Sequence, residues 1–212
     1  TTFQSLALSG EEAYARALGV MSPELRGRIF SPAMKRELGG YRAEQPLIEL
    51  MRNAPARSGL DRAQYADLKF WLPGDILTKV DRTSMAVSLE AREPLLDHHL
   101  VELAARLPET RRVSGGQGKL ALKQAMEGTL PRQILYRPKQ GFVLPIAQWF
   151  RSDLKEAARA AARSERLLDT GWFDAAALSQ LAEDHIAGRR DHARELWQLL
   201  MLERSVSLLS NN

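Results

Sequence analysis

The sequence predicts an all-α fold for the 212 residues present, and three observations lead to that prediction. Apolar residues recur at helical spacing along most of the chain, capping residues precede several of these segments, and no stretch alternates as a half-buried strand does. No internal repeat is present. Apolar residues make up 44% of the chain but form no run of the roughly 18–20 residues that span a bilayer, so we expect no membrane partner.

Three capping signals place the first helices. Residues 9–12, Ser-Gly-Glu-Glu, have the spacing of a capping box, in which the serine and the second glutamate satisfy free amides at the helix start. They predict a helix that reaches about Leu18. The pairs Ser22-Pro23 and Ser31-Pro32 each put a capping hydroxyl before a proline at the first helical position, so each predicts a further helix.

The remaining helices follow from the spacing of apolar residues and from breaks at proline and glycine. They are expected at residues 45–52, 60–71, 73–87, 97–107, 119–127, 146–163, 174–187 and 192–209. Asp97 is expected to cap the helix that follows it. A boundary near residues 164–171 divides the single domain 1–212 into a core, 1–163, and a terminal helical pair, 172–212.

One connecting segment, residues 137–145, differs from the others. Pro138 and Pro145 favour extended backbone in the residues before them, so the segment is predicted to be a loop between helices. It is cationic, aromatic and apolar at once, which is unusual for a simple connection. Residues 131–166 hold eight basic and three acidic side chains, a net charge of +5, which suits an anionic partner such as a polyphosphate or a nucleic acid.

Several kinds of chemistry lack the residues that they need. The chain has no cysteine, so the residues present form no disulfide, thiolate metal site or cysteine nucleophile, and we expect a reducing compartment, the cytoplasm. Adjacent His98 and His99 point about 100° apart on a helix, and an expected helix break separates His185 from His192. We therefore predict surface or capping histidines and no metal site.

Residues 115–119, Gly-Gly-Gln-Gly-Lys, match a phosphate-binding loop only in part. Val113 stands where that motif needs its first glycine, and Leu120 stands where a serine or threonine would hold magnesium. The better interpretation is a glycine-rich turn that starts a helix.

Four ordered segments resemble the signatures of one known family. Residues 72–82, Leu-Pro-Gly-Asp-Ile-Leu-Thr-Lys-Val-Asp-Arg, are similar to its L-P-x-D-x-L-x-K-x-D-R segment, and residues 90–97, Glu-Ala-Arg-Glu-Pro-Leu-Leu-Asp, to its E-x-R-x-P-F-L-D signature. Residues 118–123 resemble its G-K-x-x-L-R helix, and residues 137–142, Arg-Pro-Lys-Gln-Gly-Phe, its R-x-K-x-G-F loop. The departures from the usual phenylalanine, arginine and valine are Leu95, Lys123 and Glu93.

The family is that of glutamine-hydrolysing asparagine synthetase and its relatives, such as β-lactam synthetase. The resemblance implies that the chain is the helical C-terminal part of an α/β synthetase domain of the adenine-nucleotide α-hydrolase-like kind (PP-loop ATP pyrophosphatase), whose parallel sheet is missing. It also implies a reaction in which ATP, with magnesium, adenylates the side-chain carboxylate of aspartate. Ammonia released from glutamine then displaces AMP to give asparagine.

The resemblance also assigns candidate site residues. Lys139 matches a family lysine whose ammonium stabilises charge on the phosphoryl group under attack. Glu90 matches a carboxylate at the reaction centre, which orients a substrate amine or takes up a proton. The candidates for contact with the ATP phosphates are Lys139, Arg137 and Gly141. Interior ion pairs that hold the loops are expected for Asp81, Arg82 and Arg92.

Three elements of the family are missing from the sequence: the S-G-G-x-D-S pyrophosphate loop, the later S-G-[DE]-G-x-D-E segment and the catalytic cysteine of the glutaminase. We therefore expect a fragment that is inactive alone and binds neither ATP nor magnesium by itself. Its expected partner is the missing half of the enzyme, which carries the glutaminase and the ATP loop, and the expected substrates are aspartate, glutamine and ATP.

Two alternatives stay open from the sequence. One is a related enzyme that closes a β-lactam or amidates another carboxylate. The other is a non-catalytic helical module whose basic face binds nucleic acid. The four ordered signatures favour an enzyme, so we expect no nucleic-acid partner.

Overall fold

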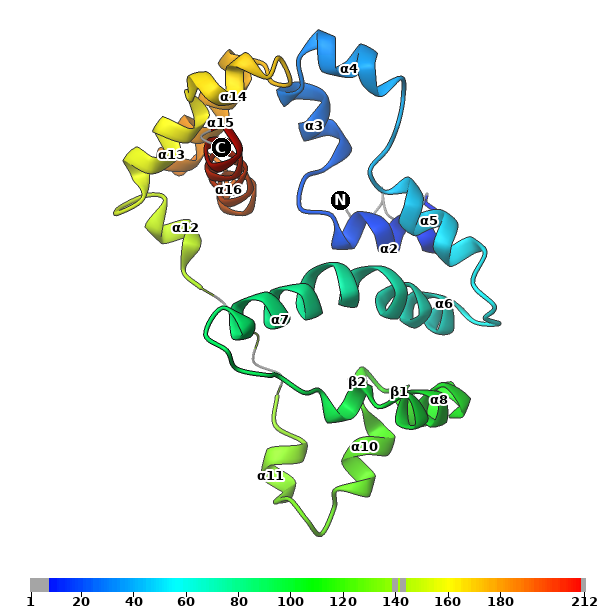
Figure 1. The fold of residues 1–212 in the computed structure, drawn as a ribbon. Helices are drawn as coiled ribbons and strands as arrows, with labels where there is room; N and C mark the ends of the chain where they lie inside the picture. The colour runs from blue at the N-terminus through cyan, green and yellow to red at the C-terminus, as the bar shows by residue number, and fades with distance from the viewer. Residues whose placement is uncertain (1–7, 139–140, 142–143, 211–212) are drawn as a thin grey trace. The chain divides into compact units, whose positions relative to one another are not determined.

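The computed structural model describes residues 8–138, 141 and 144–210, which divide into two compact units. We call residues 12–45 and 142–212 the C-terminal unit, and residues 1–11 and 46–141 the central unit. Helices account for nearly all of the regular structure in the described residues, which confirms the predicted all-α class (Figure 1). None of the described helices is long and apolar enough to cross a membrane. The division into residues 1–163 and 172–212 stays a prediction.

Short helices with local caps make up the C-terminal unit. They are α3 (Pro23–Ile29), α4 (Pro32–Leu38), α12 (Ile146–Trp149), α13 (Lys155–Ala162), α14 (Glu165–Asp169), α15 (Ala175–Ile186) and α16 (Ala193–Ser210), with most of α2 (Gly10–Leu18). Both predicted serine caps are confirmed. Ser22 Oγ accepts a hydrogen bond from the amide of Leu25 at 3.1 Å, and Ser31 Oγ accepts one from the amide of Met34 at 3.0 Å.

A single apolar cluster forms the core of the C-terminal unit. Helix α13 packs against α15 and α16, and α3 joins the same cluster. The largest fully buried apolar side chains of the cluster are Phe150, Ile29, Leu167, Leu178 and Leu196. Backbone bonds tie the two parts of the unit together, because Ser31 N donates to Trp172 O at 2.9 Å and Asp174 N donates to Ile29 O at 2.8 Å. Segments far apart in the sequence therefore share one core.

The prediction of one helix over residues 146–163 is wrong, because turns separate α12 from α13. The amide of Leu154 donates to Trp149 O at 2.8 Å, and Ser152 Oγ donates to Gln148 O at 3.0 Å. Phe150 lies fully buried at this turn. The physical reason is tertiary: the burial of one aromatic ring and the turn contacts around it outweigh the helix propensity of the segment.

The histidines were predicted to lie at the surface or to cap helices, and the surface location is wrong for His185 and His192, which are 0% and 8% exposed. Nε2 of His185 lies 3.0 Å from Ala147 O, and its Nδ1 accepts a hydrogen bond from the amide of His192 at 3.0 Å. Since Nδ1 is an acceptor, the ring proton sits on Nε2 and is donated to Ala147. The ring therefore joins α12 to the connection between α15 and α16.

A long helix dominates the central unit. The elements of the unit are α5 (Gln45–Arg52, which starts at the boundary of the units), α6 (Gly59–Ala66), η1 (Asp67–Leu77), α7 (Thr78–Met85), η2 (Pro94–Leu96), α8 (His98–Arg106), α9 (Glu109–Arg112), β1 (Val113–Ser114), β2 (Gln117–Gly118), α10 (Leu120–Ala125) and α11 (Arg132–Leu135). Segments α6, η1 and α7 follow one another without a break (Figure 1).

The predicted break before Pro73 is therefore wrong. Segment η1 is π-helical, and its wider turns accommodate the proline, which lacks an amide proton and would clash with the preceding turn of an α-helix. The hydroxyl of Thr78 donates to Pro73 O at 2.6 Å and supplies a further bond at this turn.

A small hairpin was not predicted. Strands β1 and β2 pair in antiparallel register, with Val113 opposite Gly118 and Ser114 opposite Gln117. The two residues between them, Gly115 and Gly116, have φ of 56° and 75°, as a two-residue hairpin turn of the primed type requires. The expected glycine-rich turn before α10 is thus confirmed, but strands of two residues are too short to show alternation in the sequence.

Polar contacts hold much of the central unit together. Arg112 at the end of α9 is 12% exposed and binds Asp61 of α6, with 2.5 Å between Nη2 and Oδ1. It also donates to Gln64, one turn further along α6. The hydrogen bond from Arg112 holds the pKa of Asp61 below its ordinary value. This contact ties α9 to α6 across 51 residues of sequence.

Candidate functional site

Glu90 lies in the irregular segment that connects α7 to η2. The segment is anchored at its start, where Ser88 has a φ of 59° and the amide of Leu89 donates to Ser84 O at 2.9 Å. It is anchored at its end by the bond from the amide of Leu96 to Glu93 O, also 2.9 Å. Glu90 therefore sits on a short connection whose two ends are fixed to helical elements.

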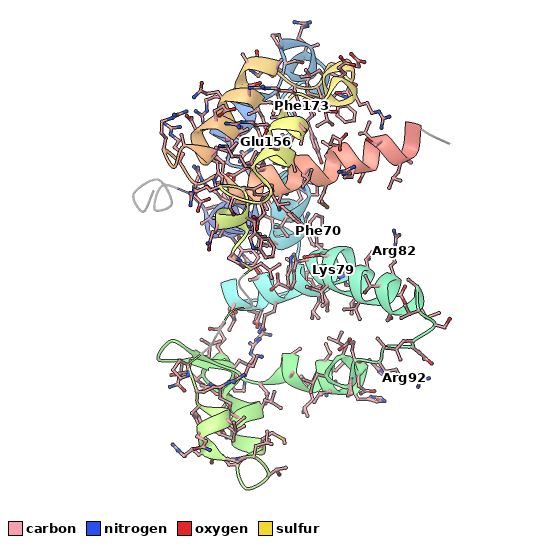
Figure 2. All side chains as sticks on the ribbon, turned by 90° about the vertical axis from the view of Figure 1, so that its left-hand side faces the viewer. Phe70, Lys79, Arg82, Arg92, Glu156 and Phe173 are labelled. Carbon is pink, nitrogen blue, oxygen red and sulfur yellow. The ribbon has the colours of Figure 1, made fainter. Side chains whose placement is uncertain are left out.

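Arg92 forms an ion pair with Glu90 at the surface of the central unit. Its Nε and Nη2 lie 2.9 Å and 2.8 Å from the same oxygen, Oε1 of Glu90. The two side chains are 81% and 69% exposed, and Figure 2 shows the Arg92 side chain at the surface. The expectation of an interior ion pair for Arg92 is wrong, because both charged groups remain in contact with water.

The same expectation is wrong for Asp81 and Arg82. Both residues are exposed on α7, and within the described ranges neither side chain forms an ion pair. On the same stretch Lys79 pairs with Asp75 at 3.1 Å. The charged side of this helix thus stays hydrated and is not used to hold an interior.

Two of the signature segments line one cavity of about 400 Å³. The first, residues 72–82, contributes the larger part of the wall, and the second contributes Ala91 and Glu93, on either side of Arg92. The complete lining is Pro73, Leu77, Thr78, Val80, Asp81, Ala91 and Glu93. Folding therefore brings the helical signature to the segment that carries Glu90.

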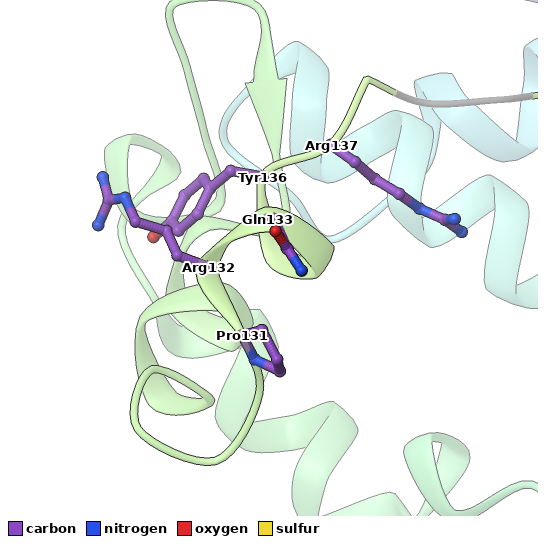
Figure 3. Close-up of a pocket in the computed structure, with 5 residues that line it drawn as sticks. All are labelled: Pro131, Arg132, Gln133, Tyr136 and Arg137. Carbon is purple, nitrogen blue, oxygen red and sulfur yellow. The ribbon is translucent and has the colours of Figure 1, made fainter.

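Arg137 lines a shallow concavity of about 690 Å³ with Pro131, Arg132, Gln133 and Tyr136 (Figure 3). The side chains of Arg132 and Arg137 extend in opposite directions, so they do not form a two-arginine clamp. Arg137 is exposed and makes no hydrogen bond or ion pair to any described residue. A single free guanidinium can still hold an anion through two parallel N–H groups.

Tyr136 is a feature of this concavity that sequence reasoning missed. The guanidinium carbon of Arg132 and the Nζ of Lys123 lie 4.7 Å and 5.3 Å from the centre of its ring. Its hydroxyl donates to Glu127 at 2.6 Å, and this hydrogen bond raises the pKa of the tyrosine above its ordinary value. A tyrosine close in sequence to several basic residues was the available signal. The ring links α10 to α11 just before Arg137.

The other candidate residues have mixed outcomes. Lys139 lies outside the described residues, and Gly141 is exposed. Asp97 caps α8 as predicted, because its Oδ1 accepts from the amides of His99 and Leu100 at 3.0 Å and 3.3 Å. Among the residues that the structure describes, no group of three or more histidine, aspartate or glutamate side chains could hold a metal ion.

Comparison with known proteins identifies the family of the chain. Residues 5–207 match the asparagine synthase family. A protein of Mycobacterium bovis that carries the name of a glutamine-hydrolysing asparagine synthetase is 39% identical over 180 residues, which are 82% of this chain and 27% of that protein. Asparagine synthetase 1 of Bacillus subtilis is 34% identical over 144 residues, which are 68% of this chain and 22% of that protein. No solved structure matches the chain.

The chain spans about a quarter of the length of these relatives. The matched range nevertheless covers almost all of the 212 residues and includes all four signature segments. Residues of the first two signatures line a common cavity. The chain belongs to the asparagine synthase family.

Proposed function

We propose that this chain is part of a cytoplasmic, ATP-dependent amidotransferase that converts aspartate to asparagine with ammonia from glutamine. The match to the asparagine synthase family over residues 5–207 carries the proposal. The names of the relatives, glutamine-hydrolysing asparagine synthetases, support glutamine as a substrate and asparagine as the product, while aspartate and ATP are what the family resemblance implies. Because the chain spans about a quarter of those relatives, the proposal assigns the glutaminase and the rest of the ATP site to polypeptide outside these residues.

Glu90 is the proposed proton acceptor for the attacking nitrogen. Ammonia that adds to an acyl-adenylate carbonyl gains positive charge, and a carboxylate in contact with it can take up the proton as AMP leaves with its electron pair. The exposed carboxylate supports this role, because within the described residues Oε2 of Glu90 makes no hydrogen bond or ion pair. That oxygen is free to accept a proton.

Arg137 is the described candidate for contact with the phosphates of ATP. ATP supplies the adenylyl group that activates the aspartate carboxylate, and an exposed guanidinium without an acidic partner fits its phosphate oxygens. Lys139 and Gly141 join the proposal through the R-x-K-x-G-F resemblance. In the proposed whole enzyme, magnesium is bound together with the phosphates of ATP.

The first test uses the chain by itself. We expect the purified chain to form no asparagine and to catalyse no exchange of pyrophosphate into ATP. Either activity, if it exceeded that of a Lys139→Ala control, would show that the chain does not depend on a further half.

The second test uses the whole synthetase that we propose contains this chain. Lys139→Ala should lower adenylation by about 10²- to 10⁴-fold, which is the scale for the loss of one preorganised charge. Lys139→Arg should restore little, because a planar fork does not replace a point charge on a flexible stem. Glutamine hydrolysis should survive in both variants. Lys35→Ala, at an exposed lysine of α4, is the matched control, and a synthetase rate near wild type in Lys139→Ala would refute the assignment.

A further inference from the structure

We propose that Arg92 is a positioning residue for Glu90: it holds one carboxylate oxygen so that the other stays directed to the reacting amine. The inference rests on the proposed role of Glu90 and extends it to a residue whose expected role was an interior ion pair. It follows from the geometry of the contact, from the spacing of the two residues and from their exposure.

The contact occupies one oxygen only. Both donors of the Arg92 fork, Nε at 2.9 Å and Nη2 at 2.8 Å, bind Oε1 of Glu90. An arginine that neutralised a carboxylate in the usual paired arrangement would bind both oxygens with two parallel bonds. Here Oε2 keeps its lone pairs, while the contact at Oε1 restricts the directions in which the carboxylate can turn. A restricted carboxylate with one free oxygen suits a proton acceptor.

The spacing of the pair gives the contact a local cause. Glu90 and Arg92 are two residues apart, and residues 89–93 form neither a helix nor a strand, so no helical turn keeps the two side chains apart. Arg92 can therefore reach Glu90, while Ala91 between them lines the cavity next to α7. No neighbouring helical turn orients Glu90, and Arg92 is its one hydrogen-bonding or ionic partner among the described residues.

Stability does not account for the pair. With 81% and 69% of the side chains exposed, an ion pair of this kind contributes little to folding, because water screens the charges and two long side chains lose freedom. Arg92 has no other described partner that would require it. A role in orientation therefore predicts that activity and stability respond differently when Arg92 is replaced.

The test compares Arg92→Ala, Arg92→Lys, Glu90→Gln and the Arg92→Ala/Glu90→Gln double variant in the whole synthetase. Arg92→Ala should lower kcat for asparagine formation by about 10- to 100-fold, the scale for a misplaced catalytic group. KM for aspartate and for ATP should change less than about twofold, since no substrate contact is lost. Arg92→Lys should recover only part of kcat, because it keeps the charge but not the fork.

The double variant separates positioning from direct contact. If Arg92 acts through Glu90, Arg92→Ala should cost nothing further once Glu90→Gln is present. The matched control is Arg106→Ala, because Arg106 forms a similarly exposed pair with Glu102 of α8, at 3.8 Å and with 78% and 61% of the side chains exposed. Arg106→Ala should have the kcat of wild type. Arg92→Ala should keep the unfolding midpoint and the glutaminase rate of wild type.

Three results would overturn the inference. If the reductions in kcat of the two single variants multiply in the double variant and KM rises, Arg92 contacts the substrate directly. A wild-type kcat in Arg92→Ala, with Glu90→Gln strongly impaired, would make the pair incidental and leave the proposed function intact. A wild-type kcat in Glu90→Gln would refute both the positioning role and the proposed role of Glu90.

Discussion

The two units are built from similar helices but differ in what those helices bury. In the C-terminal unit one cluster encloses buried side chains from helices α3, α13, α14, α15 and α16 and from the turn after α12, among them Phe150, Leu178 and Leu196. In the described part of the central unit, the buried apolar side chains are Leu47, Ile48, Met51 and Ala66. Phe70 and Trp71 of its long helix are 47% and 41% exposed.

This difference shows that a segment can be helical without burying its apolar side chains in a core. The stretch from α6 through α7 is helical because its backbone bonds close locally, although much of its apolar surface stays open, including a groove of about 650 Å³ beside α8. Glu90, Arg137 and Gly141 all lie in this central unit. The unit with the smaller core thus carries the described candidates, in keeping with the tendency of binding segments to come from the less stable parts of a fold.

The largest test of the contrast replaces one phenylalanine in each unit. Phe150→Ala should destabilise the C-terminal unit by about 3–5 kcal/mol, because it removes a fully buried ring and leaves a cavity. Phe70→Ala should change stability by less than about 1 kcal/mol, since that ring already contacts water. Denaturant unfolding of each variant measures both values. Equal losses of unfolding free energy would mean that Phe70 contributes as much to stability as Phe150 does, contrary to the difference between the two units.

A second test concerns the buried histidine. His185→Ala should cost about 2–4 kcal/mol, since it removes a buried ring and leaves Ala147 O and the amide of His192 without their partner. His98→Ala, at an exposed residue of α8, serves as the control and should be close to neutral. Thermal unfolding followed by circular dichroism would compare the two variants. Similar unfolding midpoints would show that the buried ring of His185 does not stabilise the C-terminal unit.

A third test concerns the contact that most clearly holds the central unit. Arg112→Ala should destabilise that unit by about 1–3 kcal/mol, because it leaves Asp61 and Gln64 without their donor. Arg132→Ala is the control, since Arg132 is 80% exposed and lies 3.5 Å from its partner, Glu127. A smaller loss in Arg112→Ala than in the control would show that the unit does not depend on this pair.

The same pair predicts a dependence on pH. The pKa of Asp61 is lowered from its ordinary value of 3.8 by Arg112, so the stability that the pair adds is fully present above that value. It is lost as the pH falls through the lower pKa of the folded state. The difference in unfolding free energy between wild type and Arg112→Ala should therefore be constant above about pH 5 and shrink below it. A constant difference down to pH 2 would contradict the assignment.

The smallest expected effects come from helix caps, which should be the same in both units. Ser22 caps α3 in one unit and Ser58 caps α6 in the other, each through a bond of 3.1 Å to the amide three residues on. Ser22→Ala and Ser58→Ala should each cost about 1 kcal/mol. Amide hydrogen exchange at Leu25 and Asp61 would measure the local loss. If one cap stabilises its helix much more than the other does, the energy of capping depends on the surrounding core.

The helices could be predicted where their signals are local. Residues 45–52 were predicted to the residue, and Ser22, Ser31 and Asp97 cap the helices that they were expected to cap. The family signatures also depend on order and spacing alone, so they were visible without a structure. The sequence did not reveal three features that depend on partners far along the chain: the pairing of Arg112 with Asp61, the burial of His185 and the turn at Phe150.

For this protein, the sequence alone determined the helical class, the caps and the family, because each rests on residues a few positions apart. The tertiary structure decided which side chains lose contact with water. It buried His185, which was expected at the surface or at a helix cap, and it left Arg92 exposed, although an interior ion pair was expected. The reason is physical: burial depends on which distant segments pack together, and the pattern within one helix shows its apolar face but not whether another element covers it.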